Sequence, residues 1–210
     1  MFPLPGAMLL PGGQLPLNIF EPRYLNMVED ALKGSRLIGM IQPVAERDEH
    51  LVPDGTTLYE VGCAGRIVQF GETEDGRYLI VLDGLIRFQV VDELESHDGY
   101  RRVHADFAPF ATDLNTSDDD ECAQIEDRDR LLAAMTRYFD INDISADTDG
   151  ISESSDQDLV TTLAMSCPFD PGEKQALLEC PTTFQRGELL TNILEIAAFA
   201  TGSVSSDIRQ

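Results

Sequence analysis

The sequence predicts an α+β fold in which a small barrel-like sheet comes first and a bundle of helices follows. Up to residue 107, short runs of branched and aromatic residues alternate with turn residues, as is typical of antiparallel strands. After residue 120 the apolar residues recur with the period of an amphipathic helix. We therefore expect a β-rich unit with one helix over residues 1–112, and an acidic linker with a helical unit over residues 113–210.

The composition limits the partners that the protein can have. The 210 residues include 15 basic and 38 acidic side chains, for a formal net charge of -23. A field of this sign repels phosphate backbones and anionic lipid surfaces, so we expect neither nucleic acid nor a membrane as partner. The first 17 residues are apolar but lack the basic start of a secretory signal. The sequence predicts a cytoplasmic protein.

The first half is expected to hold one helix and six short strands. Proline at position 22 can begin the helix and Gly34 can end it. Asp75-Gly76 and Asp83-Gly84 indicate hairpin turns, because glycine adopts positive φ at little cost. The expected strands are Leu37–Ile41, Leu58–Cys63, Arg66–Phe70, Tyr78–Leu82, Leu85–Val91 and Arg102–Phe107. Such strands favour a sheet that rolls up, with the helix covering an edge.

Four helices are expected in the second half. The first carries an apolar face from Ile125 to Phe139. Capping residues precede each of the others: Ser155 or Asp156, then Asp170 with Glu173, then Thr182 with Gln185. The expected bodies of these three helices are Leu159–Met165, Gln175–Glu179 and Leu189–Ala200.

Catalytic motifs are absent from the sequence. It contains no Walker-type loop, no GxSxG and no HExxH. His104 is expected on the surface beside Asp106, and neither Lys33 nor Lys174 looks buried enough to act as a base. We therefore predict no catalytic residue, no cofactor and no enzymatic activity.

Metal-binding patterns are weak. The four cysteines are far apart, form no CxxC pair and have no histidine at ligand spacing, which favours idle thiols. The segment from Ser145 to Asp156 spaces its oxygen ligands like a calcium loop, but serine and aspartate replace the usual ligands at its two ends. A polar loop between helices is the better interpretation, so no metal site is predicted.

The N-terminal segment carries a family resemblance. Phe2-Pro3-Leu4-Pro5-Gly6 and Leu15-Pro16-Leu17-Asn18-Ile19-Phe20-Glu21-Pro22-Arg23-Tyr24 resemble the start of the Lon protease N-terminal domain family, also called the Lon substrate-binding domain. Similar stretches follow at Leu37–Ile41, Tyr59–Ile67, Gly84–Phe88 and Tyr100–Val103, and in the helical half at Leu163–Met165, Pro168–Phe169 and Glu173–Glu179. The helical stretches look like the short stand-alone bacterial members.

The resemblance implies both a fold and a class of function. Its fold is a β-rich, PUA-like pseudo-barrel followed by a C-terminal helical bundle. In full-length Lon proteases this region recognises substrate polypeptide, and ATPase and Ser-Lys peptidase modules follow it; the 210 residues contain neither module. The resemblance therefore implies a non-catalytic, proteolysis-associated protein that binds unfolded or extended polypeptide, as an adaptor or holdase, with a separate ATPase or protease as a possible partner.

A binding surface is predicted near the proline-rich N-terminal segment. Flexible apolar side chains suit a groove for extended chains, and an arginine would serve as the polar anchor. The predicted substrate-binding residues are Met8, Leu10, Phe20, Arg23, Tyr24, Met27 and Met40. Alternatively, Phe20, Tyr24 and Leu25 are core contacts that anchor the helix to the sheet, and Arg87 pairs with Glu21 or caps a loop. Two other functions remain open: a small-molecule sensor with a site in a cleft between the two halves, and a hydrolase with an unrecognised site around His104 and Asp106.

Overall fold

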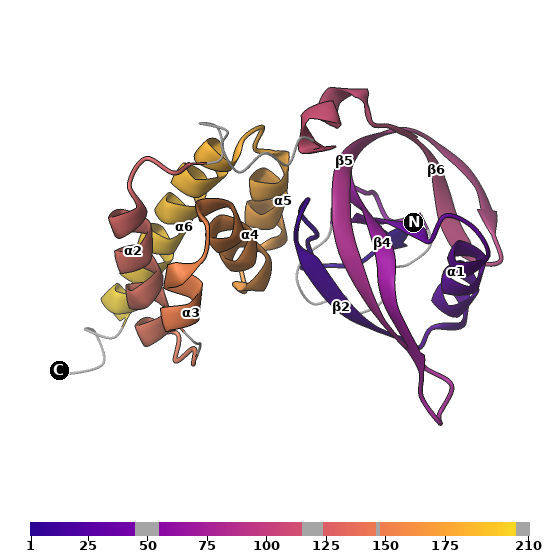
Figure 1. Ribbon diagram of the computed structural model, residues 1–210, viewed down its shortest axis with the longest axis horizontal. Helices are drawn as coiled ribbons and strands as arrows, with labels where there is room; N and C mark the ends of the chain where they lie inside the picture. The colour runs from indigo at the N-terminus through magenta and orange to yellow at the C-terminus, as the bar shows by residue number, and fades with distance from the viewer. Residues whose placement is uncertain (45–54, 115–123, 146–147, 205–210) are drawn as a thin grey trace. The chain divides into compact units, whose positions relative to one another are not determined.

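The structure is a computed structural model that describes residues 1–44, 55–114, 124–145 and 148–204 (Figure 1). The chain divides into two compact units. The first contains Met1–Thr116 and Cys167–Leu178, and the second contains Ser117–Ser166 and Glu179–Gln210. Residues 167–178 thus follow the expected boundary in sequence but belong to the first unit. The α+β class, with the sheet ahead of the helical bundle, is confirmed.

One mixed sheet of six strands forms the body of the first unit. The strands are β1 (Phe2–Pro3), β2 (Gln14–Ile19), β3 (Leu37–Ile41), β4 (Val61–Glu72), β5 (Tyr78–His97) and β6 (Tyr100–Asp106). Their order is β1-β3-β4-β5-β2, with β6 paired to the later part of β5. Only the short β1–β3 pairing is parallel among these strands.

The sheet is strongly curved, and Figure 1 shows its strands bending around a shared core. Register shifts in β4 and β5, at Ala64/Gly65 and Val90/Asp92, allow the long strands to bend. The strand order ends in β1 and β2, and within the described residues no pairing joins these two edges. The expected barrel-like curvature is therefore present, but hydrogen bonds do not close the ring.

The two predicted hairpin turns have different outcomes. Gly76 has φ 78° and lies in the turn between β4 and β5, as predicted. The turn predicted at Asp83-Gly84 is wrong, because β5 runs straight through both residues. Gly84 instead permits a close approach of the N-terminal segment: a Cβ there would lie 2.0 Å from the carbonyl oxygen of Leu10. Strand β4 is likewise one continuous strand where two were expected, at Leu58–Cys63 and Arg66–Phe70.

The first unit contains helices α1 (Pro22–Lys33) and α5 (Pro171–Glu179) and the 3₁₀ segment η1 (Ala108–Leu114). Helix α1 begins at its proline and ends before Gly34, as predicted. Polar side chains that are almost fully buried join α5 to the first unit: Lys174 Nζ donates to the carbonyl of Gly6, in the turn after β1, at 2.7 Å, and Gln175 Nε2 donates to that of Val61, on β4, at 3.1 Å. These contacts explain why α5 belongs with the sheet.

The second unit contains α2 (Arg128–Ile141), α3 (Thr148–Glu153), α4 (Asp156–Ser166) and α6 (Thr183–Val204). Helices α2 and α6 pack side by side, and Arg130 of α2 pairs with Glu195 of α6 at 2.8 Å (Figure 1). The short helix α3 was not expected, and it lies inside the segment that resembles a calcium loop. Among the described helices, none has the length and apolar character needed to span a bilayer.

Candidate functional site

The structure places most of the predicted binding residues in the core. Met8, Leu10, Met27 and Met40 are each at most 3% exposed, and Tyr24 is 4% exposed. Only Phe20, at 62%, and the partly buried Arg23 reach solvent. The predicted surface of methionine and leucine side chains is therefore corrected: these residues are core contacts, and a peptide cannot touch them in this conformation.

Glycines in the sheet explain why the N-terminal segment is absorbed into the core. A Cβ at Gly65 would lie 2.6 Å from the side chain of Leu9, and one at Gly84 would collide with Leu10. The missing side chains on β4 and β5 let residues 8–10 lie directly against the sheet, where all three are buried. These glycines supply the space that lets the apolar N-terminal segment pack in the core instead of forming a surface.

A hollow of about 180 Å³ lies where the two edge strands of the sheet come together. It is lined by β1 and the residue after it, by the end of β2 and by the start of α1: Phe2, Pro3, Leu4, Pro16, Leu17, Asn18, Ile19, Phe20, Glu21 and Tyr24. We call it the seam hollow. Its lining is mainly apolar, and it includes Phe20, the one predicted binding residue that is largely exposed.

Arg23 does not line the seam hollow, but it contacts two residues that do, Glu21 and Tyr24. Its guanidinium pairs with Glu21, with Nη2 2.9 Å from Oε2, and its Cζ lies 4.6 Å from the centre of the Tyr24 ring. The Tyr24 ring in turn packs against Phe2, with centroids 4.4 Å apart. Arg23 therefore connects a carboxylate to an aromatic pair at the hollow. Of the two alternatives for Arg87, the pairing with Glu21 is wrong, because Glu21 pairs with Arg23.

A second hollow adjoins the first along β2. It is lined by three residues from each of three neighbouring strands: Pro16, Leu17 and Asn18 of β2, Gln69, Phe70 and Gly71 of β4, and Leu79, Ile80 and Val81 of β5. Its volume is about 520 Å³, and it is wider open than the seam hollow. Phe70 and Leu79 are nearly half exposed here. Apolar surface therefore extends along β2 from Phe20 onto the neighbouring strands.

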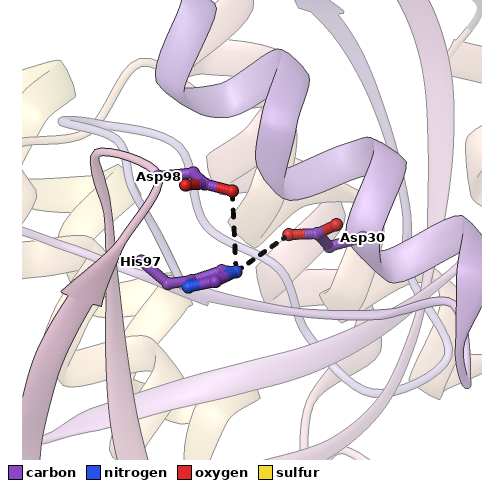
Figure 2. Close-up of side chains that lie close together, drawn as sticks. All are labelled: Asp30, His97 and Asp98. Carbon is purple, nitrogen blue, oxygen red and sulfur yellow. Dashed lines mark ion pairs between the residues drawn. The ribbon is translucent and has the colours of Figure 1, made fainter.

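A cluster of ionisable residues connects α1 to the turn between β5 and β6. Figure 2 shows the His97 ring directed toward two carboxylates: Nε2 lies 3.7 Å from Asp30 and 3.5 Å from Asp98. The imidazole nitrogen and the two carboxylates are groups that can act as ligands of a divalent metal ion. However, both oxygens of Asp30 already have protein partners, since Lys33 Nζ lies 3.1 Å from Oδ1 and the Tyr100 hydroxyl donates to Oδ2 at 3.0 Å. The cluster therefore links α1 to the hairpin formed by β5 and β6.

The two lysines differ from each other. Lys33 is exposed and paired with Asp30, as its place in the helix suggested. Lys174 is only 6% exposed, which corrects the expectation that it is not buried, and its Nζ donates to the carbonyl of Gly6. This contact gives the ammonium a structural role.

The histidine proposed for a hydrolase does not meet its expected partner. His104 is exposed, and its Nδ1 lies 3.0 Å from both carboxylate oxygens of Asp92. Asp106 instead accepts a hydrogen bond from the backbone N–H of Ala108. This surface pair offers no enclosed site, so the contacts of His104 give the hydrolase hypothesis no support.

Two of the three thiols in the described residues are poor nucleophiles. Burial raises the pKa of Cys63 to about 12 and that of Cys167 to about 12. The fourth cysteine, Cys122, lies outside the described residues, as does Asp147 of the segment that resembles a calcium loop. Among the residues that line the seam hollow, the titratable ones are Glu21, which pairs with Arg23, and Tyr24. The site therefore has the chemistry of apolar binding.

Sequence reasoning missed strand β2, which contributes residues to both hollows. The residues Leu15, Leu17 and Ile19 alternate with polar or proline residues, which is a strand signal. Proline at position 16 also fits an edge strand, because proline cannot donate to a neighbouring strand. Both signals were present, but the many prolines and glycines of the segment concealed them.

Three comparisons with known proteins agree on the relationship of this chain. The family model described as "ATP-dependent protease La (LON) substrate-binding domain" matches residues 1–195. Among curated proteins, the Lon protease of Flavobacterium johnsoniae is 26% identical over 179 residues, which covers 85% of this chain and 21% of that protein. Lon protease 2 of Myxococcus xanthus is 31% identical over 106 residues, or 50% of this chain and 12% of the relative. The matched region is thus about a fifth or less of these relatives.

Solved structures share the fold. A crystal structure of a Lon N-terminal domain protein from Xanthomonas campestris has a TM-score of 0.59 and 24% identity, covering 90% of this chain and 94% of that one. The N-terminal domain of a Mycobacterium avium complex Lon protease has a TM-score of 0.61 and 18% identity, covering 91% and 97%. At these identities the likeness establishes the fold.

Proposed function

Because the chain belongs to the family of ATP-dependent protease La (LON) substrate-binding domains, we propose that it binds extended polypeptide without cleaving it. The observation that carries the proposal is the seam hollow, an apolar site at an edge strand with the exposed Phe20 on its lining. Large exposed apolar side chains beside a hollow are typical of sites where proteins bind apolar partners.

Strand β2 provides the route for the peptide backbone. It pairs with β5 on one side, and the described residues provide no strand on its other side. An extended segment can add to such an edge through main-chain hydrogen bonds, which do not depend on sequence. Pro16 leaves one donor missing on β2, so the pairing is partial and apolar contacts must supply much of the affinity.

The two hollows along β2 provide the side-chain contacts. Successive side chains of an extended peptide point to opposite faces. The hollows share Pro16, Leu17 and Asn18, so a short segment beside β2 reaches both. We infer a preference for segments with alternating apolar side chains, and Phe20 acts as the aromatic anchor at one end.

The charge of the protein selects among apolar segments. With a net charge of -23, the long-range field raises the local concentration of basic peptides and repels acidic ones. This contribution is electrostatic, so it weakens as salt shortens the Debye length. Basic, apolar, unfolded segments are therefore the preferred clients.

An adaptor or holdase role follows from binding without cleavage. The protein holds an unfolded segment and presents it to an ATPase or a protease. Binding with micromolar affinity suits such a role, because a client must be released to the next component. We therefore expect fast exchange of bound peptide.

Fluorescence anisotropy with a labelled basic, apolar peptide that is capped at both ends tests the proposal. Phe20→Asp places a charge in the seam hollow and should weaken binding at least about tenfold, or 1.4 kcal/mol. Phe199→Asp is the matched control, since Phe199 is 67% exposed on α6 in the other unit. Circular dichroism checks that each variant is folded, and intact-mass analysis checks the peptide. Equal binding by Phe20→Asp and the parent protein, or a cleaved peptide, would overturn the proposal.

A further inference from the structure

A third hollow in the first unit has a different chemistry from the two along β2. Its volume is about 290 Å³, and it lies on the sheet where β6 approaches β3 and β4. We call it the β6 hollow, and it is lined by Met1, Leu37, Gly39, Ala64, Phe88, Leu94, Arg102, Val103, Ala105 and Phe107. All of the lining side chains are uncharged except that of Arg102, so the hollow combines apolar walls with one cationic side chain.

Arg102 is available to an anionic ligand. Its Nε and Nη2 donate to the carbonyl oxygen of Glu95, each at 3.3 Å, and the side chain is otherwise exposed. Within the described residues no carboxylate pairs with it, whereas the preceding Arg101 is held by Glu93 at 2.6 Å. Arg102 therefore places a guanidinium without a carboxylate partner beside an apolar hollow.

We propose that the β6 hollow binds the carboxyl-terminal residue of a client polypeptide. The apolar side chain of that residue lies against Leu37 and Phe107, which line the hollow and are each about 40% exposed, and its α-carboxylate pairs with Arg102. This inference rests on the proposed function, because it names a second subsite for the same class of client. Arginine suits the carboxylate because its planar guanidinium can donate two parallel hydrogen bonds.

The size of the hollow favours a single residue. Its volume is just below the range of about 300–1,000 Å³ that drug-sized ligands occupy. Gly39 in its lining preserves this space, since a Cβ there would lie 3.1 Å from the ring of Phe88. A long alkyl chain would extend beyond the apolar walls, and a simple inorganic anion would leave them unfilled. One apolar side chain with its terminal carboxylate satisfies both parts of the site.

The negative charge of the whole protein does not prevent this contact. At physiological ionic strength, interactions between exposed charges are largely screened beyond about 8 Å. A carboxylate in contact with Arg102 is therefore governed mainly by that guanidinium. Lower salt should weaken the binding of the free carboxylate relative to that of an uncharged end, because the long-range repulsion then grows.

The test compares two peptides of one sequence that end in leucine, one with a free carboxylate and one with an amide. We expect the free acid to bind about tenfold more tightly to the parent protein, since one charge-assisted contact is worth roughly 1.4 kcal/mol. Arg102→Gln should abolish the difference. Arg66→Gln is the matched control, because Arg66 is an exposed arginine of β4 that does not line the hollow. Ala105→Met should fill the hollow and weaken binding of the free acid.

The outcomes separate this inference from the proposed function. If the capped internal peptide binds but the acid and the amide bind equally, the inference is overturned and the proposed function stands. If neither the capped peptide nor the free acid binds, both are overturned. A difference that survives Arg102→Gln also overturns the inference, as does octanoate competing as well as the free-acid peptide, because the site would then accept any apolar acid.

Discussion

Arg87 binds both carboxylate oxygens of Asp113, with Nε 2.9 Å from Oδ2 and Nη2 2.7 Å from Oδ1. The backbone N–H of Arg87 also donates to Oδ2 at 2.9 Å. Both side chains are buried, at 3% and 8% exposed. A third contact, from Nη1 to the carbonyl of Leu178 at 3.1 Å, links the same guanidinium to α5. One arginine thus fastens η1 and α5 to strand β5.

Removing one partner of this pair should destabilise the protein strongly. Asp113→Ala leaves the Arg87 guanidinium buried without its carboxylate, which we expect to cost about 3–5 kcal/mol of unfolding free energy. The double variant Arg87→Met with Asp113→Leu should cost less than the single one, because no charge stays buried. Urea unfolding measures both. Arg77→Ala, which removes an exposed pair with Asp75, serves as control and should cost less than about 1 kcal/mol. A loss no larger than that control would contradict the assigned role.

The close approach at Gly84 predicts a strong penalty for alanine. The added Cβ would lie 2.0 Å from the backbone oxygen of Leu10, so the N-terminal segment or β5 must shift. We expect Gly84→Ala to lower stability by about 1–3 kcal/mol or more, the cost of overpacking. Gly71→Ala is the control, since a Cβ there meets nothing within 4 Å. Thermal unfolding compares the two variants, and equal midpoints would show that the segment does not pack as described.

The Asp30 cluster predicts a dependence of stability on pH. Hydrogen bonds from Lys33 and Tyr100 hold the pKa of Asp30 below its ordinary value of 3.8. The ionised form is therefore favoured in the folded state, so its contribution is complete above about pH 4 and is lost as the pH falls through the lower, folded-state pKa. The unfolding midpoint of Asp30→Asn should be below that of the parent protein at neutral pH, and the two should converge in acid.

A matched substitution distinguishes this effect from general acid destabilisation. Glu72→Gln changes an exposed carboxylate outside the cluster and should leave the acid limb of the stability profile unchanged. A gap between parent and Asp30→Asn that stays constant down to low pH would contradict the ionic role of Asp30.

Thiol reactivity tests the packing of two core positions. Burial raises the pKa of Cys63 to about 12 and that of Cys167 to about 12, so at about pH 8 neither forms the reactive thiolate. Both should resist iodoacetamide in the native protein and react once urea unfolds it. Cys180 is only partly buried and provides the internal comparison. Peptide mapping by mass spectrometry reads each site, and rapid native labelling of Cys63 would place it outside the core.

Local signals predicted the helices well because the information needed was local. Proline begins α1, Glu173 accepts from the N–H of Asp170 as a capping box requires, and Thr182 caps α6. The errors arose where a distant segment decides the conformation. Asp83-Gly84 is a typical turn pair. In the structure, however, Gly84 leaves room for the backbone of Leu10, which is far away in sequence and lies directly against it. No window around residue 84 contains that fact.

The candidate site was predicted in location but not in detail. The sequence indicated the segment around Phe20 and Arg23: Phe20 lines the seam hollow, and Arg23 pairs with the lining residue Glu21. It could not distinguish apolar side chains that line a surface from those that fill a core. A methionine such as Met8 or Met40 looks the same in the sequence in either place. That distinction depends on the space left by Gly65 and Gly84 on neighbouring strands.

The scarcity of accessible lysine has a practical consequence. The chain has two lysines, both within the described residues, and the amine of Lys174 is buried against the carbonyl of Gly6 while that of Lys33 reaches solvent. Reagents that acylate side-chain amines should therefore modify the native protein mainly at one position on α1. A fluorophore attached there would lie beside the Asp30 cluster. It would not lie in the seam hollow or the β6 hollow, whose linings do not include Lys33.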